Sequence, residues 1–341
     1  MNRFLATILL FFSVPLLLLV LIYLVTDPYK TLRSFSLEYF DDTNRDYLSS
    51  ELWLMNYPEQ KYDSYIFGSS RACGINTYHW LKYLPENSKQ FLFQGWGESI
   101  TGIEQKISFI DSKGLPVKNV ILLIDYPGTF GDDQVPTEAL SIKHPAFSQQ
   151  SKIIHETILF TDFVQKPSQW SRAVKRWRKG EKSFVIFDPI SNDWDKGNKD
   201  RDLSVPPDKD SLKNCSELVR NVFLKENAGK IDADLPTCEP VINKGFENQL
   251  QHIMNILAHQ GTDYRVIITP GYCYTSPKVN VKDLEILNRV FGADKVFDFS
   301  GKNYMTEDYN NYSDPGHFGM WVGWHLIEDV YNKKSESNSC D

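Results

Sequence analysis

Apolar residues follow two patterns along this chain. One long uninterrupted run lies at the N-terminus, and from about position 61 short apolar runs alternate with amphipathic segments. The short runs are β-prone, and three of them stop at glycine or proline, which is typical of strands. They cover 62–67, 90–93, 117–124, 264–269 and 295–299. The third, VKNVILLI, is nearly continuous, as expected of a strand that is buried on both faces.

Helical periodicity appears between and after these runs, over 99–113, 246–259, 281–290 and 318–331. In the first of these segments isoleucines recur at helical spacing from Ile100 to Ile110, and Gly114 predicts the end of the helix. Strands that alternate with helices predict a parallel sheet covered on both faces. The fold class expected is therefore α/β.

The alternation lapses between about 129 and 244. This stretch holds two predicted helices, over 152–164 and 168–178, followed by a polar part rich in Asp and Lys. We interpret it as an insertion in one domain that spans 61–332. Residues 27–60 have no clean period and are predicted to be a linker, and 333–341 form a polar tail.

The N-terminal run from Phe4 to Val25 contains no charged residue. As a helix, its roughly 22 residues would span roughly 33 Å, enough to cross a bilayer core. A cleaved signal peptide is the alternative, but it should end in a small-residue cleavage site, which is absent here. We therefore predict an uncleaved transmembrane signal anchor over 1–26. Basic residues flank the run on both sides, so they do not fix its orientation. A very short tail before the span and a large domain after it favour an extracytoplasmic domain.

Net charge and cysteine content argue against several classes of protein. The net charge of −7 leaves no basic excess to neutralise phosphates, which argues against a nucleic-acid partner. Five widely spaced cysteines indicate neither a disulfide framework nor a zinc ribbon. The basic and aromatic segment 170–179 has two interpretations: a solvated face of the insertion, or a surface that contacts anionic lipid or a polyanionic polymer.

Candidate chemistry lies at the strand ends, where open α/β sheets collect their ligands. The first predicted strand leads into Gly68, Ser69 and Ser70. A glycine there allows a tight turn, and a serine that begins the next helix lies near unpaired N–H groups that can stabilise an oxyanion. The alternative is that Ser69 or Ser70 only caps that helix.

The last loop places Asp314 three residues before His317, in a Pro-Gly turn that precedes the C-terminal helix. A carboxylate so placed can orient an imidazole and stabilise its charged form, as the acid of a Ser-His-Asp triad does. The alternative is that Asp314 or Ser313 caps the helix and that His317 is a surface residue.

Together, a serine after the first strand and D-x-x-H before the last helix resemble the SGNH (GDSL-type) hydrolase superfamily, over roughly 61–126 and 262–332. The family's G-D-S block reads Gly68-Ser69-Ser70 here. The resemblance implies a flavodoxin-like three-layer sandwich in which Ser70 is the nucleophile, His317 its base and Asp314 the orienting acid. It implies no metal and no organic cofactor.

The resemblance also places the oxyanion hole. The family's second block, a glycine, falls on Gly97, so the backbone N–H groups of Ser70 and Gly97 are the implied donors. The third block normally supplies an asparagine, but Asp125 occupies its place and cannot donate a hydrogen bond while ionised. This departure argues against fast general hydrolysis more than against a slow, dedicated acyl transferase.

Four residues near these blocks are candidate substrate contacts. An anionic substrate group could bind Arg71, although a structural salt bridge is the alternative. Aromatic residues at strand ends could stack on sugar rings or simply fill the core. The candidates are Arg71, Asp125, Trp96 and Tyr126, and Tyr272 and Tyr274 lie at another strand end.

Membrane-anchored relatives that read G-S-S and D-x-x-H include the alginate O-acetylation proteins and the D-alanyl-lipoteichoic acid transfer protein. The resemblance implies a membrane-anchored, extracytoplasmic serine esterase or O-acyltransferase. Its substrate class would be acyl, above all acetyl, esters of a cell-envelope polysaccharide or related glycan. A multispanning acyltransferase is the expected partner. The alternative is a catalytically weak or inactive SGNH-like scaffold for that partner, and a secreted lipase is disfavoured because the insertion shows no long apolar lid.

Overall fold

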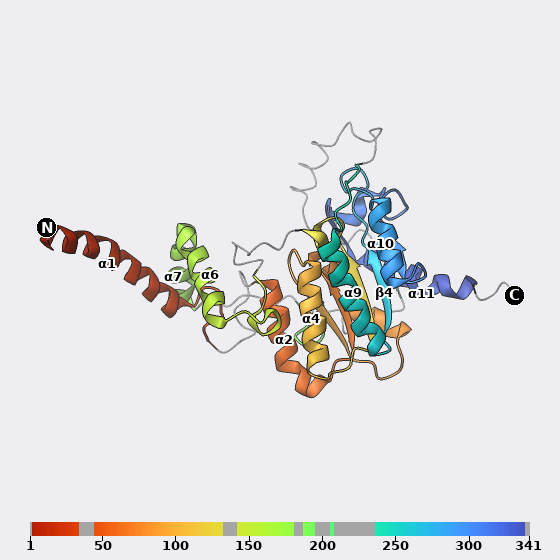
Figure 1. Cartoon of the computed structure of the whole chain (residues 1–341), viewed down its shortest axis with the longest axis horizontal. Helices are drawn as coiled ribbons and strands as arrows, with labels where there is room; N and C mark the ends of the chain where they lie inside the picture. The colour runs from red at the N-terminus through yellow and green to blue at the C-terminus, as the bar shows by residue number, and fades with distance from the viewer. Residues whose placement is uncertain are drawn as a thin grey trace. The chain divides into compact units, whose positions relative to one another are not determined.

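The computed structural model describes residues 2–33, 44–131, 142–180, 187–194, 205–207 and 236–337. The chain divides into two compact units (Figure 1). Unit 1 comprises residues 1–51 and 134–185, and unit 2 comprises 52–133 and 186–341. The two helices predicted within the insertion therefore belong to the same unit as the N-terminal helix.

Unit 2 is built on a five-stranded parallel sheet with the order β2-β1-β3-β4-β5. The strands are β1 (Ser64–Gly68), β2 (Gln90–Gln94), β3 (Asn119–Ile124), β4 (Asp263–Ile268) and β5 (Val296–Asp298). Every residue of β1 and β3 is buried, which explains the unbroken apolar run in the sequence. The predicted parallel α/β architecture is confirmed.

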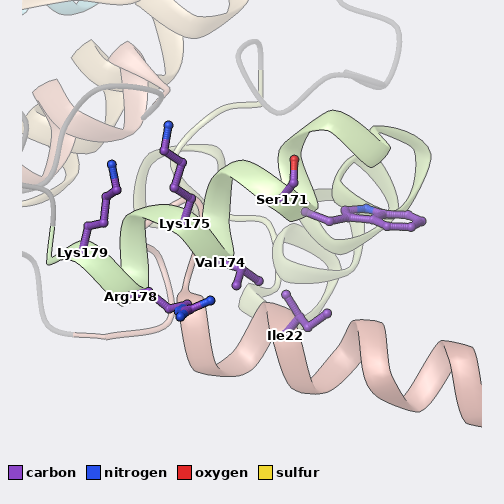
Figure 2. A pocket seen from close by; sticks show the side chains of 7 residues that line it. Ile22, Ser171, Val174, Lys175, Arg178 and Lys179 are labelled. Atoms are coloured by element: carbon purple, nitrogen blue, oxygen red, sulfur yellow. The ribbon is translucent and has the colours of Figure 1, made fainter.

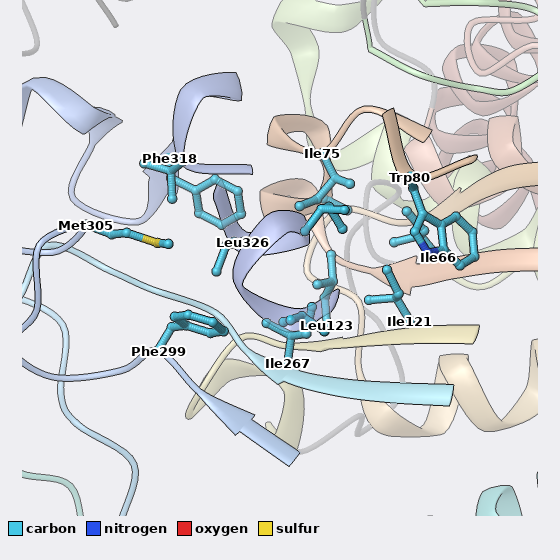
Figure 3. Close-up of a cluster of buried hydrophobic side chains, with 14 of the residues drawn as sticks. Ile66, Ile75, Trp80, Ile121, Leu123, Ile267, Phe299, Met305, Phe318 and Leu326 are labelled. Atoms are coloured by element: carbon cyan, nitrogen blue, oxygen red, sulfur yellow. The ribbon is translucent and has the colours of Figure 1, made fainter. Parts of the chain in front are cut away.

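Helices cover both faces of this sheet. They are α4 (Ile100–Ser112), α9 (Lys244–His259), α10 (Val281–Phe291) and α11 (Met320–Ser337), and Figure 1 shows α4 beside α9. On one face, Leu326 of α11 joins a core cluster with Ile66 and Ile121 of the sheet (Figure 3). On the other face, Lys106 of α4 lies over the ring of Phe93. The sheet is thus the middle of three layers.

The strand order is the flavodoxin-like order 2-1-3-4-5, in which the connections diverge between the first and third strands. Ligands of such sheets bind outside the carboxyl ends of the strands at this switch point. The segments that follow β1 and β3 begin at Ser69 and Asp125. The topology therefore favours a ligand site at the carboxyl ends of β1 and β3.

Unit 1 contains α1 (Asn2–Thr26), α5 (Pro145–Ser148), α6 (Lys152–Gln165) and α7 (Pro167–Lys179). A cluster that includes Tyr23 and Phe163 joins the end of α1 to α6. The Tyr29 hydroxyl donates to Asp162 at 2.5 Å, just beyond α1. The two helices predicted in the insertion are confirmed as α6 and α7.

The predicted transmembrane segment falls within α1. Side chains of this helix are described without interruption only from Phe11 onward. In the part of the chain that the structure describes, no helix is both long and apolar enough to cross a membrane. The span over 4–25 therefore stays a prediction.

The prediction of a linker over 27–60 is wrong for its second half, because α2 (Arg45–Gln60) forms there. Asn44 precedes the helix, and its side-chain oxygen accepts hydrogen bonds from the backbone N–H groups of Asp46 and Tyr47. Leu52 and Trp53 are buried, and Trp53 stacks on Phe93. Packing of a few large side chains stabilises this helix, which its mixed aromatic and polar sequence did not reveal. Residues 34–43 lie outside the described part.

A close backbone contact joins α11 to the short 3-10 helix η1 (Ser70–Gly74) that follows β1. A Cβ atom on Gly323 would lie 1.9 Å from the carbonyl oxygen of Gly74, and one on Gly74 would lie 2.6 Å from the Phe318 ring. Figure 3 shows Phe318 and Leu326 on the same side of the cluster as Ile75, which follows η1. The two glycines therefore let the C-terminal segment pack directly against the turn that carries Ser70.

We expect Gly323→Ala to destabilise the protein by about 1–3 kcal/mol, the usual cost of overpacking. The new methyl group would collide with backbone, and the roughly 1 kcal/mol that alanine gains over glycine in a helix offsets only part of this cost. Denaturant unfolding of the variant measures the change. Gly128→Ala is the matched control, since a Cβ there meets nothing within 4 Å. Equal midpoints for both variants would contradict the contact.

Candidate active site

The two serines in the turn after β1, Ser69 and Ser70, have different roles. Ser69 is the N-cap of η1, and its hydroxyl oxygen accepts a hydrogen bond from the Arg71 N–H at 3.3 Å. The same hydroxyl donates to the buried carboxylate of Asp125. Capping is thus the role of Ser69, and Ser70 is left with its hydroxyl directed elsewhere. Gly68 provides the room for this turn, because a Cβ there would lie 2.9 Å from the Leu123 Cβ.

Ser70, His317 and Asp314 form a continuous hydrogen-bonded chain. The Ser70 Oγ lies 2.7 Å from the His317 Nε2, and the His317 Nδ1 lies 2.8 and 2.9 Å from the two carboxylate oxygens of Asp314. Because Nδ1–H donates to the carboxylate, Nε2 is the nitrogen that accepts the Ser70 proton. The structure therefore brings together the three residues that the sequence predicted as a triad.

The Asp314 carboxylate is held by its own turn. Asp314 ends β6 (Tyr312–Asp314) and His317 begins β7 (His317–Phe318), which pairs antiparallel to it. The N–H groups of Gly316 and His317 donate to Asp314 Oδ1 at 2.9 and 3.1 Å. Pro315 and Gly316 thus form a tight turn that fixes the acid and the imidazole relative to each other.

These contacts shift both pKa values in the directions that suit proton transfer. Partial burial alone would raise the pKa of Asp314, but hydrogen bonds from His317 and the Gly316 N–H hold it below its ordinary value. The hydrogen bond to Asp314 raises the pKa of His317, against an opposing effect of burial. The carboxylate stays ionised and the imidazolium is stabilised, as a general base needs while it holds the nucleophile's proton.

Asp125 is committed to hydrogen bonds that tie three strand ends together. It lies directly after β3 and is buried. Its carboxylate accepts a hydrogen bond from the Ser69 hydroxyl, which follows β1. It also accepts one from the Thr269 hydroxyl, which follows β4, at 2.7 Å. Its backbone N–H donates to the Thr129 hydroxyl at 2.8 Å. Asp125 therefore organises the turn that presents Ser70, and the prediction that it contacts substrate has no support from this geometry.

Arg71 lies between this network and the Asp314–His317 turn. Its Nη1 donates to Thr269 Oγ1 at 3.0 Å, and its Nε lies 3.9 Å from Asp125 Oδ1. A Cβ on Gly316 would lie 3.5 Å from Arg71 Nη2, so the guanidinium lies close against the Asp314–His317 turn. Its positive charge lowers the pKa of His317, in opposition to Asp314. Arg71 therefore forms a salt bridge with Asp125 beside the triad, and its contact with a substrate stays a prediction.

We expect Arg71→Gln to move the acidic limb of the pH–rate profile to higher pH. Removing the guanidinium removes a charge that disfavours the imidazolium, so the pKa of His317 rises further and more alkali is needed to obtain the neutral base. The pH dependence of kcat/KM for an acyl ester measures this. Arg289→Gln, an exposed residue of α10 paired with Glu247, is the charge-matched control. A limb that shifts to lower pH would contradict the argument.

The loop after β2 lies beside the Ser70 turn, since the Gly95 N–H donates to the Gly68 carbonyl at 3.2 Å. Gly97 has a φ of +60°, and a Cβ there would meet nothing within 4 Å, so backbone conformation and not space requires glycine. Trp96 is 39% exposed at the same loop. The oxyanion-hole roles of the Ser70 and Gly97 N–H groups stay predictions.

One polar side chain here was missed by the sequence analysis. Gln94, the last residue of β2, is fully buried, and its Oε1 accepts from the Cys73 Sγ at 2.9 Å. Its amide nitrogen has no hydrogen-bond partner among the described residues. Gln94 pairs in register with Gly68, so an amide donor lies next to the Ser70 turn. A polar residue closing the otherwise apolar run QFLFQ was the available sign.

The prediction that Tyr126 contacts substrate has no support from the geometry. Its side chain is buried, and its hydroxyl donates to Asp283 Oδ2 at 2.8 Å. The same Asp283 accepts from the backbone N–H groups of Val241 and Ile242. Tyr126 therefore anchors the segment before α9. Tyr272 is also buried and Tyr274 is partly buried, whereas Trp96 is exposed.

No group of three or more His, Cys, Asp or Glu residues within the described ranges is arranged to hold a metal ion. Comparison with models of known protein families gives no match, and comparison with curated protein sequences gives none at a significant level. A function for this chain must therefore be argued from the geometry of the site.

Proposed function

We propose that this chain is a membrane-anchored, extracytoplasmic serine esterase or O-acyltransferase of the SGNH type. The observation that carries the proposal is the 2.7 Å contact between Ser70 Oγ and His317 Nε2, with Asp314 bound to the other ring nitrogen. Nucleophile, base and orienting acid stand in the order that acyl transfer requires. The position of Ser70 at the switch point of a flavodoxin-like sheet supports the same assignment.

In the proposed reaction Ser70 Oγ attacks the carbonyl carbon of an ester while its proton passes to His317 Nε2. The oxyanion that forms accepts hydrogen bonds from the Ser70 and Gly97 N–H groups. The tetrahedral species then expels the alcohol, which takes the proton from His317, and an acyl-serine remains. Water or a sugar hydroxyl next gives its proton to His317 and attacks the acyl carbon. Collapse of this second tetrahedral species breaks the bond between the acyl carbon and Ser70 Oγ, and Oγ takes the proton back from His317.

The hydrogen bonds that the Asp125 carboxylate already makes support slow acyl transfer rather than fast hydrolysis. A carboxylate that accepts from Ser69 and Thr269 offers no donor to an oxyanion. Loss of one such donor costs on the order of 10²–10³ in rate. A slow enzyme suits a dedicated reaction on acyl, in particular acetyl, esters of an envelope glycan. The exposed ring of Trp96 offers a surface on which a sugar can stack. A multispanning acyltransferase is the proposed source of acyl groups.

The same carboxylate favours a second candidate, a catalytically weak or inactive SGNH-like scaffold for that acyltransferase. In this case the hydrogen-bonded chain of Ser70, His317 and Asp314 would serve to hold the C-terminal segment against η1. The two candidates differ in one respect that can be measured: only the enzyme has a nucleophilic Ser70.

Labelling with a fluorophosphonate separates the two candidates. The full chain in uncharged detergent is treated with the probe, and wild type is compared with Ser70→Ala and His317→Ala. Loss of labelling in both variants is the result expected for the enzyme. Ser112→Ala, an exposed serine of α4 whose hydroxyl donates to the Phe109 carbonyl, should label as wild type does. A folded wild type that takes up no label would overturn the catalytic proposal and leave the scaffold.

A further inference from the structure

Unit 1 contains a groove of about 620 Å³ between α1 and α7, and no residue of the triad lines it (Figure 2). One residue of α1 and six of α7 line it. The residues that line it are Ile22, Trp170, Ser171, Val174, Lys175, Arg178 and Lys179. The groove thus combines an apolar floor with a basic rim.

The apolar part belongs to both helices. Figure 2 shows Ile22 of α1 and Val174 of α7 pointing toward each other, with Arg178 beside them over α1. Ile22 and Trp170 also pack against the hydrophobic cluster of unit 1, which fixes the base of the groove. Hydrocarbon is the chemistry that such a floor accepts.

The basic part comes from α7, which contains no acidic residue. Its basic residues are Arg172, Lys175, Arg176, Arg178 and Lys179. Like charges three or four positions apart on a helix repel each other, so this arrangement favours an external anion. Among the described residues, no ion pair or hydrogen bond involves the side chains of Lys175 and Arg178.

A second segment adds positive charge near the end of α1. Burial lowers the pKa of Lys30, the charges of Arg33 and Arg176 lower it further, and Asp27 opposes them. Residues some 140 positions apart in the sequence therefore bring cations close to one another at this end of the apolar helix. The positive potential here is a property of the fold and not of α7 alone.

Large apolar side chains are exposed on the same elements. On α1, Leu17, Leu21 and Leu24 are 65%, 57% and 53% exposed, and Trp177 of α7 is 54% exposed. Leucine-rich surface flanked by Lys, Arg and Trp is typical of helices that lie at a membrane interface. A basic residue at the C-terminus of α7 also favours the helix dipole, but that explains neither the apolar floor nor the exposed leucines.

From these contacts we infer that the groove between α1 and α7 binds an anionic phospholipid of a bilayer. The headgroup phosphate contacts Lys175 and Arg178, and an acyl chain lies along Ile22 and Val174. A polyanionic polymer would use the cations but not the apolar floor. The inference is independent of Ser70 and shares with the proposed function only a location at a membrane.

The test measures lipid selectivity of the full chain in uncharged detergent. Native mass spectrometry gives apparent dissociation constants for phosphatidylglycerol and phosphatidylcholine. Each Lys or Arg near an anionic headgroup contributes a few-fold in affinity, so wild type should prefer phosphatidylglycerol about tenfold. Lys175→Gln/Arg178→Gln should abolish that preference. Lys113→Gln/Lys282→Gln removes the same charge from exposed positions in unit 2 and should retain it.

Equal affinity of wild type for the two lipids would overturn the inference, as would an undiminished preference in Lys175→Gln/Arg178→Gln. Binding of heparin but not of phosphatidylglycerol by wild type would assign the surface to a polyanionic polymer and would also overturn it. None of these results depends on the reactivity of Ser70, so this inference and the proposed function can fail separately.

Discussion

Ser70→Ala and His317→Ala are each expected to lower kcat/KM for an acyl ester by about 10⁴–10⁶-fold, as loss of a nucleophile or its base does in serine hydrolases. Without the Ser70 hydroxyl no acyl-enzyme can form. Without His317 the hydroxyl keeps its proton, because no other described base contacts Ser70 Oγ. Hydrolysis of a chromogenic acetyl ester by the full chain measures both effects.

The double variant Ser70→Ala/His317→Ala separates a triad from two independent contributions. Residues that act as one unit give strongly non-additive losses, so the double variant should be no slower than either single variant. Ser112→Ala should retain full activity. Multiplicative losses, or activity that survives in Ser70→Ala, would show that the hydrogen-bonded chain in the structure is not the catalytic unit.

The sequence predicted the sheet and its helices because their periodicity is local. A continuous apolar run such as 119–124 can be recognised without knowing its neighbours, and a cap such as Ser99 before α4 is set by adjacent residues. The triad was predictable for a similar reason. Asp314 and His317 lie in one turn, and Ser70 follows the first strand, so only one long-range contact had to be inferred.

Buried polar contacts over long distances could not be predicted in this way. Asp193 belongs to the polar part of the sequence that is rich in Asp and Lys, yet it is fully buried, and its carboxylate accepts from the N–H and hydroxyl of Thr77. Burial raises the pKa of Asp193 to about 6 despite these hydrogen bonds. Its partner Thr77 lies 116 residues away in the sequence, and no local sequence pattern predicts such a pair.

Asp125 shows how such a contact changes an interpretation. From the sequence it was a residue that fails to supply an oxyanion donor and a candidate substrate contact. In the fold it is the acceptor that holds Ser69 and Thr269, with Arg71 nearby. At the position of Asp125 the fold thus has a structural hydrogen-bond acceptor. Gln94, whose amide nitrogen is buried without a partner among the described residues, lies next to the same turn.

Lys106→Met is expected to destabilise the protein by about 3–5 kcal/mol, the usual cost of leaving one member of a buried ion pair without its partner. Lys106 of α4 donates to the Glu98 carboxylate, and both side chains are almost completely buried. Glu98 directly follows Gly97, and its carboxylate also accepts from the Ser99 N–H at 3.1 Å. The pair therefore fixes the loop that is proposed to supply an oxyanion-hole donor. Denaturant unfolding measures the loss.

A double-mutant cycle tests whether the pair, and not the bulk of Lys106, is responsible. Glu98→Gln retains an acceptor for the Ser99 N–H, so Glu98→Gln/Lys106→Met should recover most of the stability that Lys106→Met loses. Lys244→Met, at an exposed pair with Glu247, should change stability by no more than about 1 kcal/mol. If the recovered double variant is folded but hydrolyses the ester more slowly, the ion pair positions the Gly97 N–H. Additive losses in the cycle would instead show that Lys106 stabilises α4 by packing on Phe93.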